Sequence, residues 1–486
     1  MTNPRPYRMA AGLVQVCALL ALAVPLAAAP LSESLFATNW YTVLIMDSRS
    51  GYSCQTIRHE GQGVETVEQT VLRVKMGEAS LTASREERRH YDADLRLVSI
   101  EHKADQVGRK VQISATRQGD TMRYVKQSPD GTARGDVPLP AGFGSELQVL
   151  QAISDGALKP GWAQSFTTFD CDLLKVDTIS MTALEAVQTP RPGWLVSAKS
   201  KLLGLETRTW IAADGTLLRQ EVPSMMGMAL QLATEQEALR DLSPLLLATS
   251  IPVNRELGSP QELTQVVLGA VAHTGSAADM IPSTPRQTVT ERDGKVEVTV
   301  RSETPPELTA KLPFTGPELQ PFLQPGDLAQ SQNPRLKAKA AAILGGETDA
   351  WQAALKLIRW VNHEMRKVPS EPRPISALEI LDTMRGDCTE HAILLAALAQ
   401  AAGLPAKMAA GLAYDRQAYH YHAWNELYVG RWVEVDATWG EDTVDAGHLQ
   451  ISAAALDSAS MARLSLAAGR TMGSLELQII SHEAKP

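Results

Sequence analysis

Residues 385–392, RGDCTEHA, place a cysteine at the start of an apolar helix, and this stretch organises the second half of the chain. Asp387 is well placed as an N-cap, and Glu390 stands three residues later, which is the D-x-x-E form of a capping box. Cys388 then falls in the first turn of a helix predicted over 392–402. Free backbone N–H groups and the helix dipole favour thiolate over thiol there. By itself, a cysteine at a helix start is more often a buried small residue than a nucleophile.

Two predicted β-strands beyond this helix carry the other residue types that thiol acyl transfer needs. His422 and Asp436 lie 14 positions apart on successive strands around Gly430. If the loop has three residues, 429–431, with the glycine in the left-handed position, the two side chains share a face of the sheet and lie diagonally adjacent. A two-residue turn would put them on opposite faces. The pattern predicts a Cys388–His422–Asp436 triad, in which the imidazole takes the thiol proton and the carboxylate fixes its tautomer.

The same strands allow two further interpretations. His420 and His422 form an H-x-H pair that could bind a metal together with Asp436. The triad already uses His422, and the set lacks the H-x-x-x-H or C-x-x-C spacing of common metal sites, so we expect no metal ligands here. Trp424 shares the face of His422, and we expect it to line the substrate cleft. No acidic loop has the pattern of a calcium site, and no cofactor is expected.

Several linked motifs resemble the core of the bacterial transglutaminase-like proteins. They are RGDCTEHA at 385–392, AGLPA at 402–406, YHAWNE at 421–426, WVEVDAT at 432–438 and the trailing GHL at 447–449. The family commonly has proline where Ala437 follows the aspartate in this chain. The resemblance spans 320–455. It implies a papain-like fold at the site and cysteine-dependent acyl chemistry, either amide hydrolysis or transfer to an amine.

The first 29 residues have the parts of a secretory signal peptide. Arg5 and Arg8 precede an apolar run over 9–26, and the small residues 27–29 follow. An uncleaved membrane anchor is the alternative, because the run approaches spanning length. Pro25 and the alanine-rich composition favour cleavage. We therefore expect a bacterial protein that is periplasmic or secreted.

Charge and cysteine content bound the possible partners. The formal net charge is −9, and loss of residues 1–29 would make it −11, because two arginines and no acids are removed. A mildly acidic chain without a basic patch is not expected to bind nucleic acid. Beyond residue 29 the cysteines are Cys54, Cys171 and Cys388, an odd number. Cys54 and Cys171 either pair or stay reduced, and under both alternatives Cys388 keeps a free thiol.

Residue periodicity divides the 486-residue chain into several domains. Short runs of alternating or β-branched residues, separated by turn dipeptides, predict a β-rich domain over 30–241 that forms a sheet, sandwich or half-barrel. Residues 242–333 have the pattern of a small β unit and a proline-rich linker. Helical periodicity followed by antiparallel strands predicts an α+β domain over 334–486.

Together these observations predict an exported enzyme whose transglutaminase-like α+β domain follows a β-rich N-terminal region. The leading function is hydrolysis of peptide or isopeptide bonds in a protein or peptide substrate. Transamidation, which joins a glutamine acyl group to an amine, is the second alternative. The third is a non-catalytic envelope binding protein with a vestigial triad. The β-rich region either packs as a spacer or binds an envelope partner.

Overall fold

The structure is a computed structural model. It describes residues 33–485, except 77–78, 130, 142, 144–145, 189–190, 241–244, 247–249, 274, 308–309 and 369–374. The chain divides into two compact units, one ending at Leu246 and the other beginning at Leu247. The predicted signal segment, residues 1–29, lies outside the described residues. Within the described ranges, no helix has both the length and the apolar character needed to cross a membrane.

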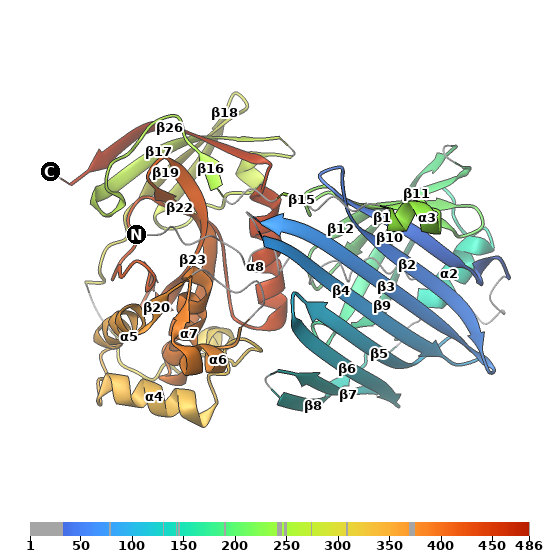
Figure 1. Ribbon diagram of the computed structural model, residues 1–486, viewed down its shortest axis with the longest axis horizontal. Coiled ribbons are helices and arrows are strands. Elements are labelled where there is room, and N and C mark those ends of the chain that lie inside the picture. The colour runs from blue at the N-terminus through green and yellow to red at the C-terminus, as the bar shows by residue number, and fades with distance from the viewer. Residues whose placement is uncertain are drawn as a thin grey trace. The chain divides into compact units, whose positions relative to one another are not determined.

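One sheet of 15 strands dominates the first unit (Figure 1). Its path runs β8-β7-β6-β5-β4-β3-β2-β1-β14-β13-β12-β11-β10-β9, and β15 pairs with β3. The strands are β1 (Thr38–Ile45), β2 (Ser48–Glu60), β3 (Gly63–Met76), β4 (Ala79–Tyr91), β5 (Leu97–Gln106), β6 (Arg109–Gln118), β7 (Thr121–Ser128), β8 (Gly131–Pro138), β9 (Ala163–Asp170), β10 (Lys175–Val187), β11 (Gly193–Ser200), β12 (Glu206–Ala212), β13 (Leu217–Val222), β14 (Met228–Ala233) and β15 (Leu245–Leu246). The helices are α2 (Glu146–Ser154) and α3 (Glu235–Leu239).

This sheet curves so that strands from its two ends, β6 and β9 among them, pack around one interior that holds both apolar and charged side chains. Ile100 and Ile113 on neighbouring strands pack in one buried cluster with Leu147 of α2 and Phe169 of β9. The alternation of buried and exposed residues along β5 follows the two-residue period of a strand with one covered face. The predicted β-rich N-terminal region is confirmed, as one continuous sheet.

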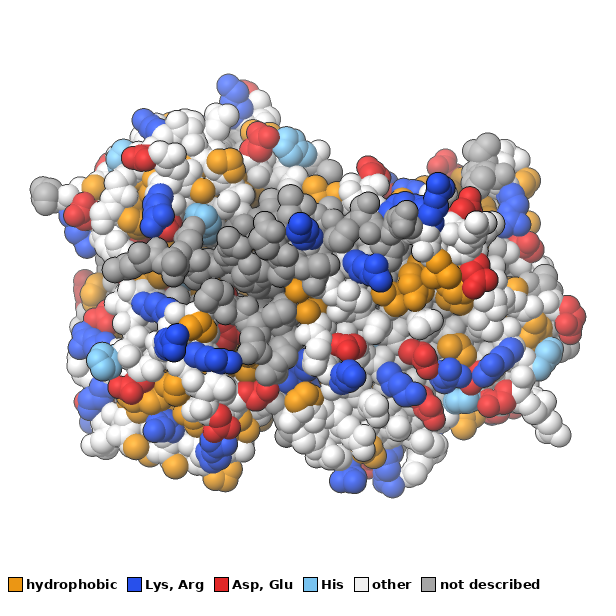
Figure 2. Space-filling view, in the orientation of Figure 1, with side chains coloured by type: hydrophobic (Ala, Val, Ile, Leu, Met, Phe, Trp, Pro, Cys, Tyr) orange, Lys and Arg blue, Asp and Glu red, His pale blue; other side chains and the backbone are white. Residues whose placement is uncertain are grey.

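The interior face of β4 also carries charged side chains, which form what we call the Arg89 network. Its members are Arg85, Glu87, Arg89, His102, Glu146 and Asp172. Arg89 donates to Glu87 and to Glu146, both at 2.7 Å, and to the carbonyl of Phe169 at 3.1 Å. A cavity of about 120 Å³ lies beside Arg89. Surface charges are mixed as well: Figure 2 shows acidic and basic side chains interspersed over the visible face of each unit.

All three described cysteines are free. Cys54 lies on β2 and is partly buried, whereas Cys171 follows β9 and is buried. The alternative of a Cys54–Cys171 disulfide is therefore not realised in this structure, and both residues have the reduced form.

The second unit combines helices with three small sheets. The sheets are a five-stranded one with the path β16-β23-β22-β25 and β24 beside β23, a four-stranded one with the order β18-β19-β17-β26, and the pair β20-β21. The strands are β16 (Ser250–Pro252), β17 (Leu263–Ala272), β18 (Gln287–Arg292), β19 (Lys295–Arg301), β20 (Arg366–Lys367), β21 (Arg385–Gly386), β22 (Ala406–Asp415), β23 (Ala418–Tyr428), β24 (Trp432–Val435), β25 (His448–Ala454) and β26 (Leu475–Ala484). The helices are α4 (Pro334–Leu344), α5 (Ala350–Glu364), α6 (Ala377–Thr383), α7 (Cys388–Ala401) and α8 (Ser458–Thr471).

Helix α7 forms the centre of this unit (Figure 1). Every residue over 390–400 is buried, because the alanine- and leucine-rich sequence is apolar on all sides. Helices α4, α5 and α6 and strands β22 and β23 pack around it. Gly403 follows the C-cap with φ 79°, a left-handed conformation that ends the helix.

Residues 242–333 were expected as a small unit of their own, but β15 joins the sheet of the first unit and β16 to β19 join the second unit. β17 pairs with β26 near the chain end, and β16 pairs with β23. Arg286 forms a buried ion pair with Glu434 through two nitrogens, at 2.8 and 2.7 Å. These partners lie 148 or more positions away in sequence, so the local pattern predicted the strands but not their assembly.

Candidate active site

The start of α7 has the predicted cap. Asp387 is the N-cap and accepts from the backbone N–H of Thr389, and the Glu390 side chain accepts from the backbone N–H of Asp387 at 2.8 Å. A Cβ atom at Gly386 would lie 2.3 Å from the Cβ of Glu390, so glycine is required for this close approach. Cys388 is the first residue of the helix, as predicted.

The register of β23 and β24 decides whether the predicted histidine and aspartate meet. Tyr428 pairs with Trp432, which leaves a three-residue loop, 429–431, in which Gly430 has φ 107°. The predicted odd loop is therefore confirmed. The structure brings the two side chains together: His422 Nε2 lies 2.7 Å from Asp436 Oδ2.

The sulfur of Cys388 borders the same strand. The backbone N–H of Ala423, next to His422, bonds to the thiol. One turn further along α7, the side-chain amide of Asn425 donates to the carbonyl of Ala392 at 3.1 Å and fixes β23 against the helix. No hydrogen bond joins Cys388 to His422 in the described part of the chain. Catalytic hydrogen bonds are often loose before substrate binds.

Electrostatics at Cys388 oppose the predicted thiolate. Burial raises the pKa of the Cys388 thiol well above its ordinary value, and the nearby carboxylates of Asp387 and Glu390 raise it further. The side chain is only 5% exposed. Loss of hydration and acidic neighbours therefore outweigh the helix terminus, and the resting sulfur is protonated.

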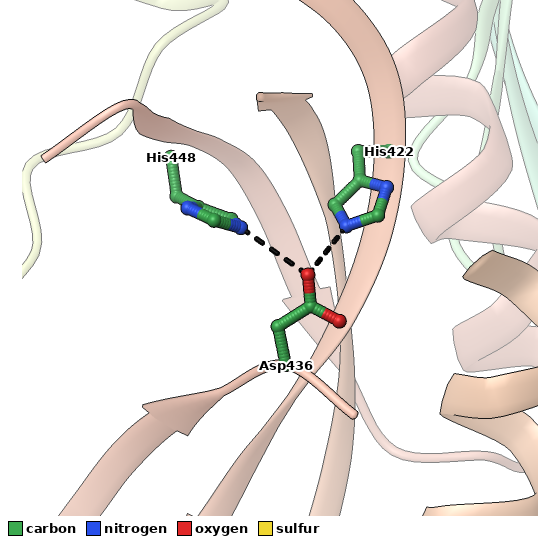
Figure 3. A group of neighbouring side chains, drawn as sticks. All are labelled: His422, Asp436 and His448. Atoms are coloured by element: carbon green, nitrogen blue, oxygen red, sulfur yellow. Dashed lines mark hydrogen bonds and ion pairs between the residues drawn. The ribbon is translucent and has the colours of Figure 1, made fainter. Parts of the chain in front are cut away.

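Asp436 is fully buried, and both of its oxygens accept hydrogen bonds. Oδ1 accepts from the backbone N–H groups of Thr438 at 2.6 Å and Trp439 at 3.3 Å. Oδ2 accepts from His422 and also from His448, whose Nε2 is 3.4 Å away (Figure 3). Although burial alone would raise the pKa of Asp436, the two imidazoles lower it well below its ordinary value. This carboxyl group is ionised at neutral pH.

His448 is a site residue that the sequence analysis quoted in the GHL stretch without giving it a role. It begins β25 and is completely buried. Its Nδ1 lies 3.1 Å from Asp445 Oδ1, on the side opposite Asp436. The only sequence signal was its place in a family-like motif, because its partner Asp436 is 12 positions away and lies outside β25, just after β24.

Two tryptophans flank these imidazoles. Trp424, expected to line the substrate cleft, is 1% exposed, and its indole N–H donates to Glu434 at 2.8 Å, so the structure places it in the core. Trp439 is half-buried and stacks on the His422 ring, with centroids 4.8 Å apart and planes 24° apart. Of these two tryptophans, Trp439, three residues after Asp436, is therefore the one that is partly exposed to solvent.

The residues that could hold a metal differ from the set of His420, His422 and Asp436 that the sequence suggested as an alternative. His422, Asp436 and His448 have ligand atoms within 4.8 Å of one another and could hold a cation, and Glu441, Asp445 and His448 form an adjoining set. His420 belongs to neither set and lies where β23 pairs with Ser250 of β16. The nitrogens and oxygens of these two sets already bond to one another.

His391, in the first turn of α7, makes a local contact. His391 Nδ1 lies 2.6 Å from the carbonyl oxygen of Asp387, one turn back in α7. Burial lowers the pKa of His391, so the ring is neutral and Nδ1–H is the donor. Its role at this position is to fix the first turn of the helix that presents Cys388.

Comparison with solved structures finds distant likenesses. A proposed cysteine protease from Cytophaga hutchinsonii is 17% identical, with 46% of this chain and 90% of that chain covered and a TM-score of 0.31. A β-barrel-like protein with a domain of unknown function from Brucella abortus is 12% identical, covers 43% of this chain and 98% of its own, and has a TM-score of 0.33. A proposed protease from Parabacteroides distasonis is 12% identical, with 70% and 68% covered and a TM-score of 0.18.

No curated protein matches the chain. The family model of the transglutaminase-like superfamily matches residues 337–437. That range begins in α4 and ends one residue after Asp436, so it holds all three predicted triad residues. Residues 337–437 therefore form a C-terminal domain of the transglutaminase-like superfamily.

Proposed function

We propose that the chain is an exported cysteine-dependent acyl-transfer enzyme that hydrolyses peptide or isopeptide bonds. Cys388 is the nucleophile, His422 the general base and acid, and Asp436 the residue that orients the imidazole. We also interpret the helix-start cysteine and the following antiparallel strands as a papain-like arrangement. The substrate is a protein or peptide, and the β-rich unit is available for an envelope partner.

One observation carries the proposal. Asp436 accepts from Nε2 of His422, so Nδ1 is the ring nitrogen left for a thiol proton. The next residue along the strand, Ala423, bonds through its backbone to the Cys388 sulfur. An ionised carboxylate, an imidazole oriented by it and a protonated thiol are the three groups that base-activated attack requires, and their presence on neighbouring elements supports the proposal.

The proposed reaction has two stages. The thiol proton moves to His422 Nδ1 while sulfur attacks the amide carbonyl carbon, and a tetrahedral oxyanion forms. The C–N bond then breaks, the imidazolium proton goes to the leaving amine, and a thioester remains on Cys388. Water, deprotonated by His422, attacks the thioester carbonyl and releases the acid and the thiol. The backbone N–H of Cys388 is the candidate to stabilise the oxyanion, because those of Thr389 and Glu390 donate to the Asp387 side chain in the capping box.

A small neutral thiol probe tests the nucleophile. We expect iodoacetamide to label Cys388 in a bell-shaped pH profile, with the modified site identified by peptide mass spectrometry, and we expect Cys388→Ala to abolish both the labelling and the release of amine from a mixed peptide library. Cys171→Ala is the matched control, because Cys171 is also buried with a raised pKa but is distant in sequence from the triad. Faster labelling of Cys54 or Cys171 than of Cys388 would contradict the assignment.

Transamidation is supported by the burial of the site. Cys388 is only 5% exposed, and this burial limits access of water to a thioester on its sulfur. With a glutamine peptide and a primary amine both present, hydrolysis predicts a glutamate residue in the peptide and release of ammonia, and transfer predicts a substituted amide with release of ammonia. If neither product forms while Cys388 labels slowly, the vestigial-triad alternative holds.

Export rests on the predicted signal over residues 1–29. N-terminal sequencing of the protein recovered from the periplasm or medium tests it. We expect a mature chain that begins near residue 30, and an uncleaved start would favour the anchor alternative.

A further inference from the structure

His448 is placed as a link between two groups of acidic side chains. Its Nε2 faces Asp436 Oδ2 at 3.4 Å and its Nδ1 faces Asp445 Oδ1 at 3.1 Å, with Glu441 Oε2 4.0 Å from Nδ1. A neutral imidazole has a single N–H and cannot donate to carboxylates on both sides. An imidazolium can, so this geometry by itself favours the charged ring.

The groups that face His448 come from every element around it. The acidic ones are Asp436 after β24 and Asp445 and Glu441 in the following loop. The positive Arg286 is bound to the backbone carbonyl of His448 and is neutralised by Glu434. On the remaining sides lie aromatic rings, at centroid distances of 5.7 Å for His422, 5.2 Å for Trp424 and 5.0 Å for Trp439.

The pKa shifts of His448 and of Glu441 agree with this geometry. Burial alone would lower the pKa of His448, but Asp445, Asp436 and Glu441 raise it to about 10. Burial also raises the pKa of Glu441 to about 8, so this group is largely neutral at pH 7. One imidazolium then stands between two carboxylates at neutral pH.

We propose that His448 is a positioning residue: its imidazolium, anchored on Asp445, holds Asp436 against His422. The inference deepens the proposed function and rests on it only for its catalytic consequence. Asp436 Oδ2 receives two ring N–H groups from different strands, so the carboxylate cannot rotate away from His422 without losing a second ion pair. The positive charge also keeps the carboxylate ionised in a site that burial would otherwise neutralise.

The protonation state is tested on the full chain, independently of any activity. In ¹⁵N-histidine-labelled protein, the signal that disappears in His448→Gln is expected to have imidazolium chemical shifts from pH 5 to pH 9. Neutral imidazole shifts at pH 7 would overturn the proposal. So would a stoichiometric transition metal, detected by elemental analysis and lost in His448→Gln, because an imidazolium cannot bind a metal.

The catalytic consequence is tested by the pH profile of Cys388 alkylation. His448→Gln keeps a side-chain donor and removes the charge, so both limbs of the profile are expected to move upward by about half to one pH unit, with about tenfold loss at the maximum. His448→Lys keeps the charge and is expected to leave the limbs within about 0.2 pH unit of the parent. Near-ultraviolet circular dichroism identifies variants that fail to fold.

These readouts separate the two hypotheses. Folded His448→Gln with unchanged limbs and an unchanged rate would overturn the positioning role while leaving Cys388 as the nucleophile. If the parent Cys388 reacts no faster than a simple thiol, the proposed function fails, and the NMR experiment still decides the charge state of His448.

Discussion

The Arg89 network in the first unit and the acidic groups around His422 and His448 in the second unit contain the same kinds of residues. They differ in which histidine contacts carboxylates through both ring nitrogens. In the first unit, Cys171 lies close to Glu87 and Arg89, and His102 hydrogen-bonds to Glu87 and forms an ion pair with Asp172. Both ring nitrogens of His102 are therefore engaged by carboxylates, at 3.0 and 3.2 Å. This buried cluster also holds a cysteine, a histidine and an aspartate, but its histidine has no ring nitrogen left to accept a thiol proton.

In the second unit, the histidine that contacts carboxylates through both ring nitrogens is His448, and not the triad histidine His422. His448 uses both nitrogens on carboxylates, as His102 does, but it stands behind Asp436 and not beside the cysteine. Among the described residues, His422, on the strand β23 whose Ala423 contacts the Cys388 sulfur, uses only Nε2. Under the proposed function, the difference predicts that a reactive thiol site depends on which imidazole nitrogen is left to accept the thiol proton, and not on the residue types alone.

The most severe test of this comparison is Asp436→Asn. The amide cannot fix the His422 tautomer as the carboxylate does, and it leaves His448 without one counter-charge, so the rate of Cys388-dependent turnover or alkylation at pH 7 should fall by about 10²- to 10⁴-fold. Glu87→Gln, which removes a carboxylate from His102 in the first unit, is the matched control and should leave the rate unchanged. A loss below about threefold in folded Asp436→Asn would refute the role of Asp436.

Arg89→Met addresses the other network. Without the guanidinium, the buried carboxylates of Glu87 and Glu146 lose the hydrogen bonds and the positive charge of Arg89. The free energy of unfolding of the first unit should therefore fall by about 3–5 kcal/mol in urea titration. Cys388 alkylation should stay at the parent rate. The double variant Arg89→Met/Glu146→Gln should recover part of the stability, and no recovery would mean that apolar packing, not charge, accounts for the loss.

Stability at alkaline pH should depend on His102. The carboxylates of Asp172 and Glu87 overcome the effect of burial and raise the pKa of His102 to about 9, from 6.5 when unfolded. Its contribution is fully present below pH 6.5 and is lost as pH rises through 9, on the order of 1–3 kcal/mol. Urea unfolding at pH 6 and pH 9.5 should show this decline in the parent and a smaller one in His102→Gln. Equal slopes in both proteins would exclude the imidazolium.

Trp439→Ala should have a moderate effect on the reaction. The indole covers the His422 ring, and its removal opens the 2.7 Å bond between His422 and Asp436 to water, so we expect about tenfold slower alkylation with unchanged limbs of the pH profile. Trp360→Ala on α5 is the control, since its half-buried ring packs under Lys339. A similar loss in both variants would point to general destabilisation.

The smallest effect is expected at a surface ion pair. Arg335 and Asp382 bond across the exposed sides of α4 and α6. Solvent and salt screen such pairs, so Arg335→Gln should leave the urea midpoint unchanged within error and have no effect on Cys388. A clear shift would mean that this exposed pair behaves like the buried networks.

The sequence by itself determined the local chemistry of the site. The D-x-x-E cap at Asp387, the even spacing of His422 and Asp436 and the glycine in the connecting loop each follow from short-range rules of helix ends and hairpin register, and the structure has each of them. The β-rich first region followed from residue alternation, and α4 and α5 followed from apolar residues three and four positions apart.

Tertiary structure alone decided which long-range partners these side chains meet. Burial of Trp424 depends on Glu434 and His448, the joining of residues 242–333 to the second unit depends on β26, and the charge on His448 depends on three acids that fold around it. The protonated state of Cys388 likewise reflects burial beneath surrounding elements, which opposes the local helix dipole. Hydration and pairing of a charge are set by everything packed against it, whereas caps and register are set by neighbours in the chain.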